Sequence, residues 1–200
     1  MASPGFFYVI LFMIEIIPFQ SSWTTTFNNI AAQLRASLSG DALAIHHIGS
    51  TSVPGLAAKN VIDIQVTVSH LQVAVQQQLE ENDFIFHTGN IGDHKPPGRD
   101  DLGPAELAKL FYHKNEPRVN LHIRERGRFN QRYPLLCRDY LRSHPLAAKA
   151  YEEIKKQLAH HFPNDANAYY AVKDPVFDLI MSGAEDWATF TGWQLPASDA

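Results

Sequence analysis

Two apolar, β-branched stretches flank a short polar loop between residues 44 and 68. In the second stretch, successive side chains point to opposite sides of a strand. One side is aliphatic and can pack into a core: Ile62, Ile64, Val66 and Val68. The other side is largely polar: Val61, Asp63, Gln65 and Thr67. The pattern predicts strand, loop, strand, with a carboxylate and an amide facing the open side of the loop.

The loop is rich in glycine and hydroxyl side chains. Glycine allows a positive φ or a close approach of the backbone to a ligand. Successive N–H groups in such a turn can form an anion-binding concavity, and the hydroxyls add donors. A loop of this kind could hold a triphosphate, with a lysine to neutralise its charge. The candidate phosphate-binding residues are Gly49, Ser50, Thr51, Ser52 and Lys59.

The run HIGSTSVPGLAAKNVIDI at residues 47–64 resembles the signature of the GrpB-like family, also called UPF0157. Shorter matches follow the same order: IIPFQSSW near the N-terminus, LHIRERG at 121–127, RDYLRSHP at 138–145, and Tyr169 followed by Lys173-Asp174. The resemblance covers roughly residues 14–180. It implies an α/β (α+β) fold like that of the nucleotidyltransferase superfamily: a small mixed β-sheet with flanking helices and a helical C-terminal part beside the loop.

The remaining periodicity predicts the elements around this centre. Residues 24–38 place apolar groups three and four apart, as on one helical face, and a second helix follows Ser69 with an apolar stripe from Leu71 to Leu79. Residues 83–86 predict a short strand. Residues 118–124 predict another, with His122 on its polar face. If that strand neighbours the Asp63 strand, His122 and Asp63 can approach one another.

Residues 88–104 hold too many turn formers for regular structure and predict a long loop. Long loops inside compact domains are often functional, so Arg99 could close over a ligand. The alternative is a solvated excursion. A Pro-Gly-Arg near this place recurs in the family, and the resemblance therefore favours Arg99 as a phosphate-binding residue.

From residue 133 onward the pattern is helical, with proline punctuation. Pro145 suits a first helical turn, and Asp174 with Pro175 predicts the start of a new helix. The tail after Trp193 is expected to be disordered. We expect three parts: an N-terminal extension (1–13), a GrpB-like domain (14–182) and a C-terminal tail (183–200). The apolar run in the extension lacks a preceding Lys or Arg and is too short to span a bilayer, so we do not interpret it as a signal peptide.

Composition and charge narrow the class of protein. With 45% hydrophobic and 19% charged residues, the chain is typical of a soluble globular domain. Its net charge of −4 gives no general attraction to polyanions, so nucleic acid and membranes are not expected partners, and any phosphate site must be local. The single Cys137 favours a reducing compartment, and we expect the protein in the cytoplasm.

Nucleotidyl transfer needs a triphosphate cradle, a divalent metal held by carboxylates and an in-line acceptor. Enzymes of the resembling fold supply two carboxylates two positions apart on one strand and a third from another strand. Here Asp63 is the first, Gln65 stands at the second position, and His122 stands in place of an acid. Asp63 and Gln65 could still hold a single Mg²⁺ when a nucleotide supplies the remaining oxygens. Asp63 would anchor this ion or act as the catalytic base, and His122 would be a general base or a metal ligand.

Hypotheses of different classes stay open. The first is an enzyme, or former enzyme, that acts on a nucleotide or phosphorylated small molecule. The second is a non-catalytic module for an anionic metabolite, using the same loop with Arg138 and Arg142, which lie four apart on one helical face. An accessory biosynthetic enzyme with an activated phosphate donor is a third. Ordinary structural roles also remain: Asp63 bonded to loop N–H groups, and the two arginines in ion pairs with Asp139.

Overall fold

The two apolar stretches form neighbouring strands of one mixed sheet. The computed structural model describes residues 13–71 and 74–200, and its five strands are β1 (Ala44–Ile48), β2 (Ile62–Val68), β3 (Ile85–Phe86), β4 (Lys109–Lys114) and β5 (Val119–Glu125). Their order is β1-β2-β5-β4-β3, in which β2 and β5 are parallel and the other neighbours are antiparallel. The predicted mixed sheet is confirmed, and so is the expectation that the Asp63 strand and the His122 strand are neighbours.

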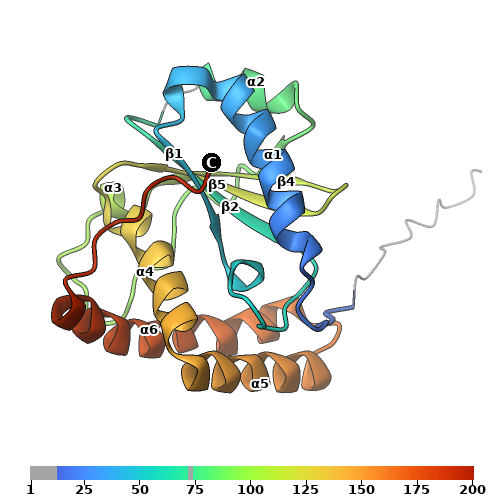
Figure 1. Ribbon diagram of the computed structural model, residues 1–200, viewed down its shortest axis with the longest axis vertical. Helices are drawn as coiled ribbons and strands as arrows, with labels where there is room; N and C mark the ends of the chain where they lie inside the picture. The colour runs from blue at the N-terminus through green and yellow to red at the C-terminus, as the bar shows by residue number, and fades with distance from the viewer. Residues whose placement is uncertain (1–12, 72–73) are drawn as a thin grey trace, which may run out of the picture.

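Helices lie on both sides of the sheet (Figure 1). They are α1 (Ser22–Leu38), α2 (Ala74–Glu80), α3 (Pro104–Leu107), α4 (Phe129–Ser143), α5 (Pro145–His161) and α6 (Ala166–Thr191). In Figure 1, α5 and α6 run together below the sheet, and the loop after β1 points toward them. No helix in the described ranges has both the length and the apolar character needed to cross a bilayer. The expected location in the cytoplasm stays a prediction.

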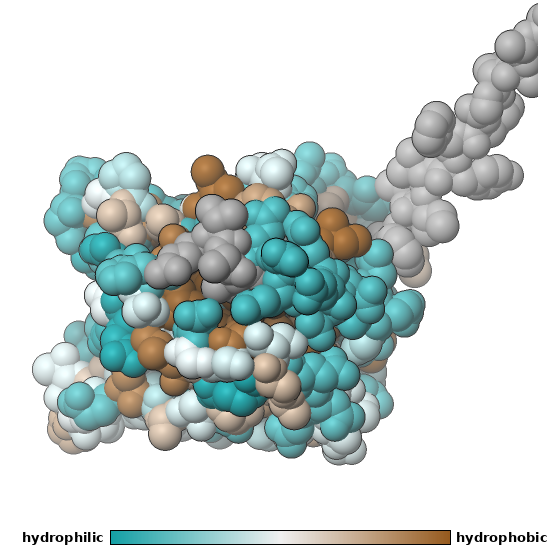
Figure 2. Space-filling view, turned by 90° about the horizontal axis from the view of Figure 1, so that it is seen from above, coloured by the Kyte–Doolittle hydropathy of each residue, from teal (hydrophilic) through white to brown (hydrophobic). Residues whose placement is uncertain are grey.

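The aliphatic side of β2 forms the main core, as its alternation predicts. Ile62, Ile64 and Val66 are buried against α1 and against the apolar side of β5. Of the predicted stripe after Ser69, Leu79 is buried and Leu71 packs against the core, whereas residues 72 and 73 and the side chains of 74 and 75 lie outside the described part, as do residues 1–12. Seen from above, the described surface is mostly hydrophilic, with apolar side chains in small groups (Figure 2).

A second apolar cluster joins the loop to the helical C-terminal part. Val53 and Leu56, from the segment after the loop, pack with side chains of α4, α5 and α6. The expected position of this helical part beside the loop is confirmed. Because apolar burial is the main favourable term in folding, this cluster anchors the far end of the loop to the helices.

The structure corrects two expectations about the C-terminal part. No new helix begins at Pro175: α6 begins at Ala166, where the Asp165 carboxylate accepts the N–H of Ala168 at 2.9 Å, and it continues through the proline. Proline removes an N–H donor and crowds the preceding turn, but buried residues on both sides of it hold one continuous helix, Tyr169 before it and Met181 after it. The tail beyond Trp193 is not disordered, because it is hydrogen-bonded along β1.

The long loop of residues 88–104 is fixed at Asp93. Its carboxylate accepts hydrogen bonds from Arg124 at 2.8 and 2.9 Å, from Lys109 at 2.8 Å and from the amide of Asn130 at 2.9 Å. Burial opposes ionisation of Asp93, but Arg124 and Lys109 outweigh it and hold the pKa of the carboxyl well below its usual range. One carboxylate therefore pairs two cations, each no more than 6% exposed, on the polar side of the sheet.

Asp93→Asn should lower the free energy of unfolding by about 3–5 kcal/mol, because it leaves the two buried cations without a counter-charge. Asp93 is ionised to a lower pH in the folded chain than in the unfolded chain. Its stabilisation is therefore complete above about pH 4 and is lost as the pH falls further. Denaturant unfolding at pH 7 and pH 3 measures both effects.

The matched control is Asp101→Asn, which removes an exposed carboxylate paired with the exposed Arg99 and should change stability by less than about 0.5 kcal/mol. Equal losses in the two variants would show that the buried pairing does not stabilise the fold as argued.

Candidate functional site

The loop after β1 turns sharply at Gly49 and lies directly against Asp63. Gly49 has φ +69°, in the left-handed region that glycine adopts without strain. A short 3₁₀ turn, Ser50–Ser52, follows, and Ser52 closes it by donating its N–H and its hydroxyl to the Gly49 carbonyl at 3.2 and 2.6 Å. A Cβ atom at Gly49 would lie 2.9 Å from both Cβ and Cγ of Asp63. The backbone therefore approaches the carboxylate as closely as only glycine permits.

Asp63 is partly buried at the start of β2. The parallel register pairs it with Asn120 of β5, whose amide nitrogen donates to Asp63 Oδ1 at 2.8 Å. Burial raises the pKa of Asp63, against the opposing effects of the Asn120 hydrogen bond and of the ammonium groups of Lys59 and Lys173. The carboxylate thus lies where water is scarce and positive charge is near.

Three lysines from different segments surround this carboxylate: Lys59 from the loop, Lys155 from α5 and Lys173 from α6. Each interacts electrostatically with Asp63. Lys59 also donates a hydrogen bond to the Tyr170 hydroxyl. Lys173 pairs with its neighbour Asp174 at 3.0 Å while remaining only 12% exposed. The resulting cluster combines one central carboxylate with three ammonium groups.

Lys155 also fixes the backbone that leads to Lys59. Its ammonium donates to the Ala57 carbonyl at 2.5 Å, and Glu152, one helical turn earlier, accepts the Ala57 N–H at 2.8 Å. Both backbone groups of Ala57 are therefore held by one face of α5. Burial lowers the pKa of Lys155 to about 7.

Two buried tyrosines, Tyr151 and Tyr169, lie next to the cluster of Asp63 and the three lysines. Tyr151 of α5 is 2% exposed and hydrogen-bonded to Ser50, and burial raises its pKa well above the usual value. Tyr169 of α6 is fully buried, with its ring centroid 5.5 Å from the Lys59 ammonium. Among the residues that the structure describes, its hydroxyl has no hydrogen-bond partner. Buried polar groups are nearly always bonded, so this hydroxyl indicates a place for a water molecule or a ligand atom.

Gln65, the predicted second metal ligand, is committed to other partners. Its side-chain oxygen accepts from Arg124 Nη1 at 2.7 Å, and its amide nitrogen donates to the Gln131 carbonyl at 2.9 Å. Within residues 13–71 and 74–200, no three histidine, cysteine or carboxylate side chains form a group that could hold a metal ion. Asp63 is therefore the one anionic oxygen donor that this part of the strand offers.

His122, the predicted base, does not stand opposite Asp63. The register pairs it with Gln65, two residues further along the strand, and Asn120 takes the place beside Asp63. Burial, together with the Arg124 charge, holds the pKa of His122 well below its usual value. Its ring nitrogen Nδ1 lies 3.3 Å from an Arg124 nitrogen, so the neutral ring accepts a hydrogen bond there.

Arg99 lies away from the loop. It pairs with Asp101 at 2.7 Å and lines an open groove of about 530 Å³ beside the N-terminal end of α4. That end of α4 follows the last residue of β5, whereas Asp63 lies beside the start of β5. A strand of seven residues separates the two places by about 20 Å.

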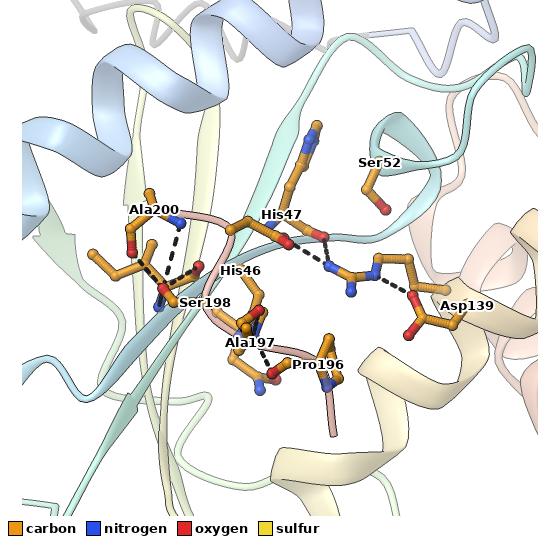
Figure 3. Close-up of polar contacts among 12 residues, drawn as sticks. His46, His47, Ser52, Asp139, Pro196, Ala197, Ser198 and Ala200 are labelled. Atoms are coloured by element: carbon orange, nitrogen blue, oxygen red, sulfur yellow. Dashed lines mark hydrogen bonds and ion pairs between the residues drawn. The ribbon is translucent and has the colours of Figure 1, made fainter. Parts of the chain in front are cut away.

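Arg138 and Arg142, both on α4, donate hydrogen bonds to backbone carbonyls of the loop and of the last residues of β1. Arg142 donates to the Ser52 carbonyl at 3.1 and 2.8 Å. Arg138 donates to the His47 carbonyl at 3.0 Å and pairs with Asp139 and Asp199 at 2.8 and 2.7 Å (Figure 3). Both guanidinium groups are therefore bonded within the chain, and they fix the two ends of the turn.

Sequence reasoning overlooked the contributions of the two last helices. Lys155, Lys173, Tyr151 and Tyr169 were not candidates, because a helical stripe does not reveal which distant strand it will meet. One signal was present: Tyr169 and Lys173 belong to the last short family match. No such signal marked Lys155.

Fold and site together define a class: a mixed α/β domain in which a glycine–hydroxyl loop lies over a single carboxylate ringed by lysines. The sequence model of the family described as GrpB protein matches residues 13–182, and the chain belongs to that family.

Relatives of this chain carry different names. It is 32% identical over 178 residues to UPF0157 protein YqkA of Bacillus subtilis (strain 168), covering 87% of this chain and 48% of that protein. It is 33% identical over 196 residues to a protein named dephospho-CoA kinase from Mycolicibacterium paratuberculosis, covering 90% of this chain and 48% of that protein. The chain thus spans about half the length of these relatives.

A solved structure shares the fold. The crystal structure of the conserved protein GrpB from Enterococcus faecalis superposes with a TM-score of 0.69 at 28% sequence identity, covering 86% of this chain and 99% of that one. The shared fold extends over nearly all of the Enterococcus protein.

Gly49→Ala should destabilise the fold by about 2–4 kcal/mol, because the new methyl group meets Asp63 in addition to straining the positive φ. Gly55→Ala is the matched control: its φ is +77°, and a Cβ atom there meets nothing within 4 Å. It should cost only about 1–2 kcal/mol. Denaturant unfolding compares the two variants, and equal losses would contradict the close approach of the loop to Asp63.

Proposed function

We propose that the chain binds a small phosphorylated molecule, such as a nucleotide, at the cluster formed by Asp63, Lys59, Lys155 and Lys173. One observation carries this proposal. Lys59 and Lys155 have no carboxylate at ion-pairing distance in the described part of the chain; their hydrogen bonds go to a tyrosine hydroxyl and to a backbone carbonyl. The Lys155 side chain is buried and that of Lys59 is partly buried. A buried ammonium group is costly unless it is paired, and a phosphate group supplies a charge that both lysines lack.

Neighbouring groups support the same ligand chemistry. The turn after Gly49 carries the Ser50 hydroxyl, which is bonded to Tyr151. The Tyr169 hydroxyl, on a ring whose centroid lies 5.5 Å from the Lys59 ammonium, has no hydrogen-bond partner among the described residues. Asp63 Oδ2, which lies beside Gly49, accepts no hydrogen bond from the described residues and can accept one from a ligand hydroxyl. A phosphorylated molecule that also carries hydroxyl groups, as a nucleotide or a sugar phosphate does, matches both kinds of partner.

The donor set does not fit a resident Mg²⁺ ion. Mg²⁺ prefers several hard anionic oxygens in octahedral geometry. Here Asp63 is a single carboxylate among ammonium groups, and the Gln65 oxygen is bonded to Arg124. Lysine charge can neutralise a phosphate without a metal ion, so we expect binding in the absence of divalent cations.

Nucleotidyl transfer is the second candidate, favoured by the arrangement of strand, glycine–serine loop and strand with Asp63 at its start. The relative named dephospho-CoA kinase is about twice as long as the matched region, so its name supports no more than an association of this domain with phosphate chemistry. Release of pyrophosphate from a nucleoside triphosphate would favour transfer; binding without release would favour a purely binding role.

Isothermal titration calorimetry with ATP, CTP, GTP, UTP and pyrophosphate, each in EDTA and in Mg²⁺, tests the proposal. At least one ligand should bind in EDTA. Lys59→Met and Lys173→Met should each weaken its binding about 10–100-fold, because each removes a charge-assisted hydrogen bond worth about 1.5–3 kcal/mol. Bound ligand should also raise the melting temperature by mass action.

Lys95→Met is the control, since this lysine lies on the long loop and pairs with the exposed Asp100 at 3.7 Å. Its affinity should equal that of the wild type. If none of the ligands binds, or if all three lysine variants bind with equal affinity, the proposed location is wrong.

The affinity should also depend on pH through Lys155. Burial lowers the pKa of Lys155 to about 7 in the free protein, so the group is cationic below that pH and loses its charge as the pH rises. Anion affinity should therefore fall by about 3- to 10-fold between pH 6 and pH 8.5, relative to Lys155→Met measured with the same ligand. The comparison cancels titration of the ligand, and a ratio that does not change with pH would contradict a contribution from Lys155.

A further inference from the structure

The segment after α6 returns to the sheet and lies along β1. Gly192 ends α6 with a positive φ of +66°, and the indole N–H of Trp193 donates to Asp139 at 3.0 Å. The chain then crosses α4 and ends its path beside β1, as the red trace in Figure 1 shows. Two distant parts of the sequence are thereby in contact.

The contact occupies the free edge of the sheet. β1 is the first strand in the sheet order, so one side of its backbone has no neighbouring strand. Asp199 N–H donates to the Ile45 carbonyl at 2.9 Å, and the Ile45 N–H donates to the Ser198 hydroxyl at 2.9 Å. The His47 N–H donates to the Asp199 carboxylate at 2.9 Å. The tail therefore satisfies edge groups that would otherwise be open to another chain.

Side chains around the edge match the tail in charge and in hydrogen bonding (Figure 3). Arg138, only 3% exposed, pairs with the Asp199 carboxylate at 2.7 Å and donates to the His47 carbonyl. Nε2 of the buried His46 ring lies 3.3 and 3.1 Å from the carbonyls of Pro196 and Ala197. Since carbonyls only accept, the neutral ring carries its proton on Nε2.

We propose that the outer edge of β1, with Arg138 and His46, is a docking site for an extended peptide that carries adjacent serine and aspartate residues, and that residues 196–199 are its resident ligand. Backbone hydrogen bonds to a strand edge give affinity, and side-chain partners give specificity. Here the serine hydroxyl and the aspartate carboxylate replace part of the strand ladder, and the buried guanidinium selects the negative charge.

The resident segment is held by polar contacts rather than by burial. Ala197, Ser198 and Asp199 remain exposed while they make these bonds. A segment with few buried apolar contacts opens at low cost. Its tether, however, gives an effective concentration of about millimolar, so that a free peptide cannot displace the wild-type segment at lower concentrations. A test must therefore weaken the resident segment first.

The experiment uses the full chain with Asp199→Asn and a free peptide with the sequence of residues 194–200. Hydrogen exchange followed by NMR at Ile45 and His47 reports on the edge. In the variant, exchange at these two amides should accelerate at least about tenfold, because a charge-assisted bond to Arg138 is lost. Millimolar wild-type peptide should restore slow exchange, whereas the same peptide with asparagine in place of aspartate should not.

Ser198→Ala is a second variant, which removes the partner of the Ile45 N–H and should be rescued in the same way. Asp186→Asn, an exposed change on α6, is the control and should leave both amides as in the wild type. Unchanged exchange in both tail variants, or acceleration that the wild-type peptide does not reverse, would overturn the proposal.

Discussion

The approach of the Gly49 backbone to the Asp63 carboxylate is the contact on which the rest of the site depends. A carboxylate in scarce water needs donors and positive charge close by. Asn120 supplies a donor because the parallel register of β2 and β5 places it beside Asp63, and α5 holds the backbone of Ala57, two residues before Lys59. Sheet register, loop turn and helix packing thus converge on a single side chain.

The polar side chains of the sheet form two clusters, one around Asp93 and one around Asp63, that differ in how they are paired. At one end, Asp93 neutralises Arg124 and Lys109, and Arg124 in turn binds Gln65. The charged groups there are paired with one another at hydrogen-bond distance, and such pairing stabilises a buried polar network. At the other end, around Asp63, the Tyr169 hydroxyl has no partner among the described residues, and Lys59 and Lys155 have no carboxylate at ion-pairing distance there. This difference, more than the loop motif, supports the proposed phosphate site around Asp63.

Local pattern explains which parts were predictable. The alternation of apolar and polar residues predicted which sides of β2 and β5 are buried, and the glycines and hydroxyl residues around Gly49 predicted the loop. Both patterns are local, because each is contained in a few consecutive residues. The lysines of α5 and α6 and the docked tail depend on contacts between residues about 100 or more apart, which no local pattern contains. The β4 strand was not predicted, although it pairs with the neighbouring β5. His122 illustrates the limit: its strand and face were predicted, but a shift of two residues put Asn120 beside Asp63.

His47 connects the edge of the sheet with the loop. Its N–H donates to Asp199, its carbonyl accepts from Arg138, and its ring nitrogen Nε2 lies 3.0 Å from the Thr51 hydroxyl. Burial lowers the pKa of His47 to about 4, so the ring is neutral near pH 7 and its bond to the loop carries no charge. Because one residue joins both regions through its backbone and its ring, the C-terminal segment and the turn that approaches Asp63 are both bonded to the same strand, β1, and the two proposed sites are connected through His47.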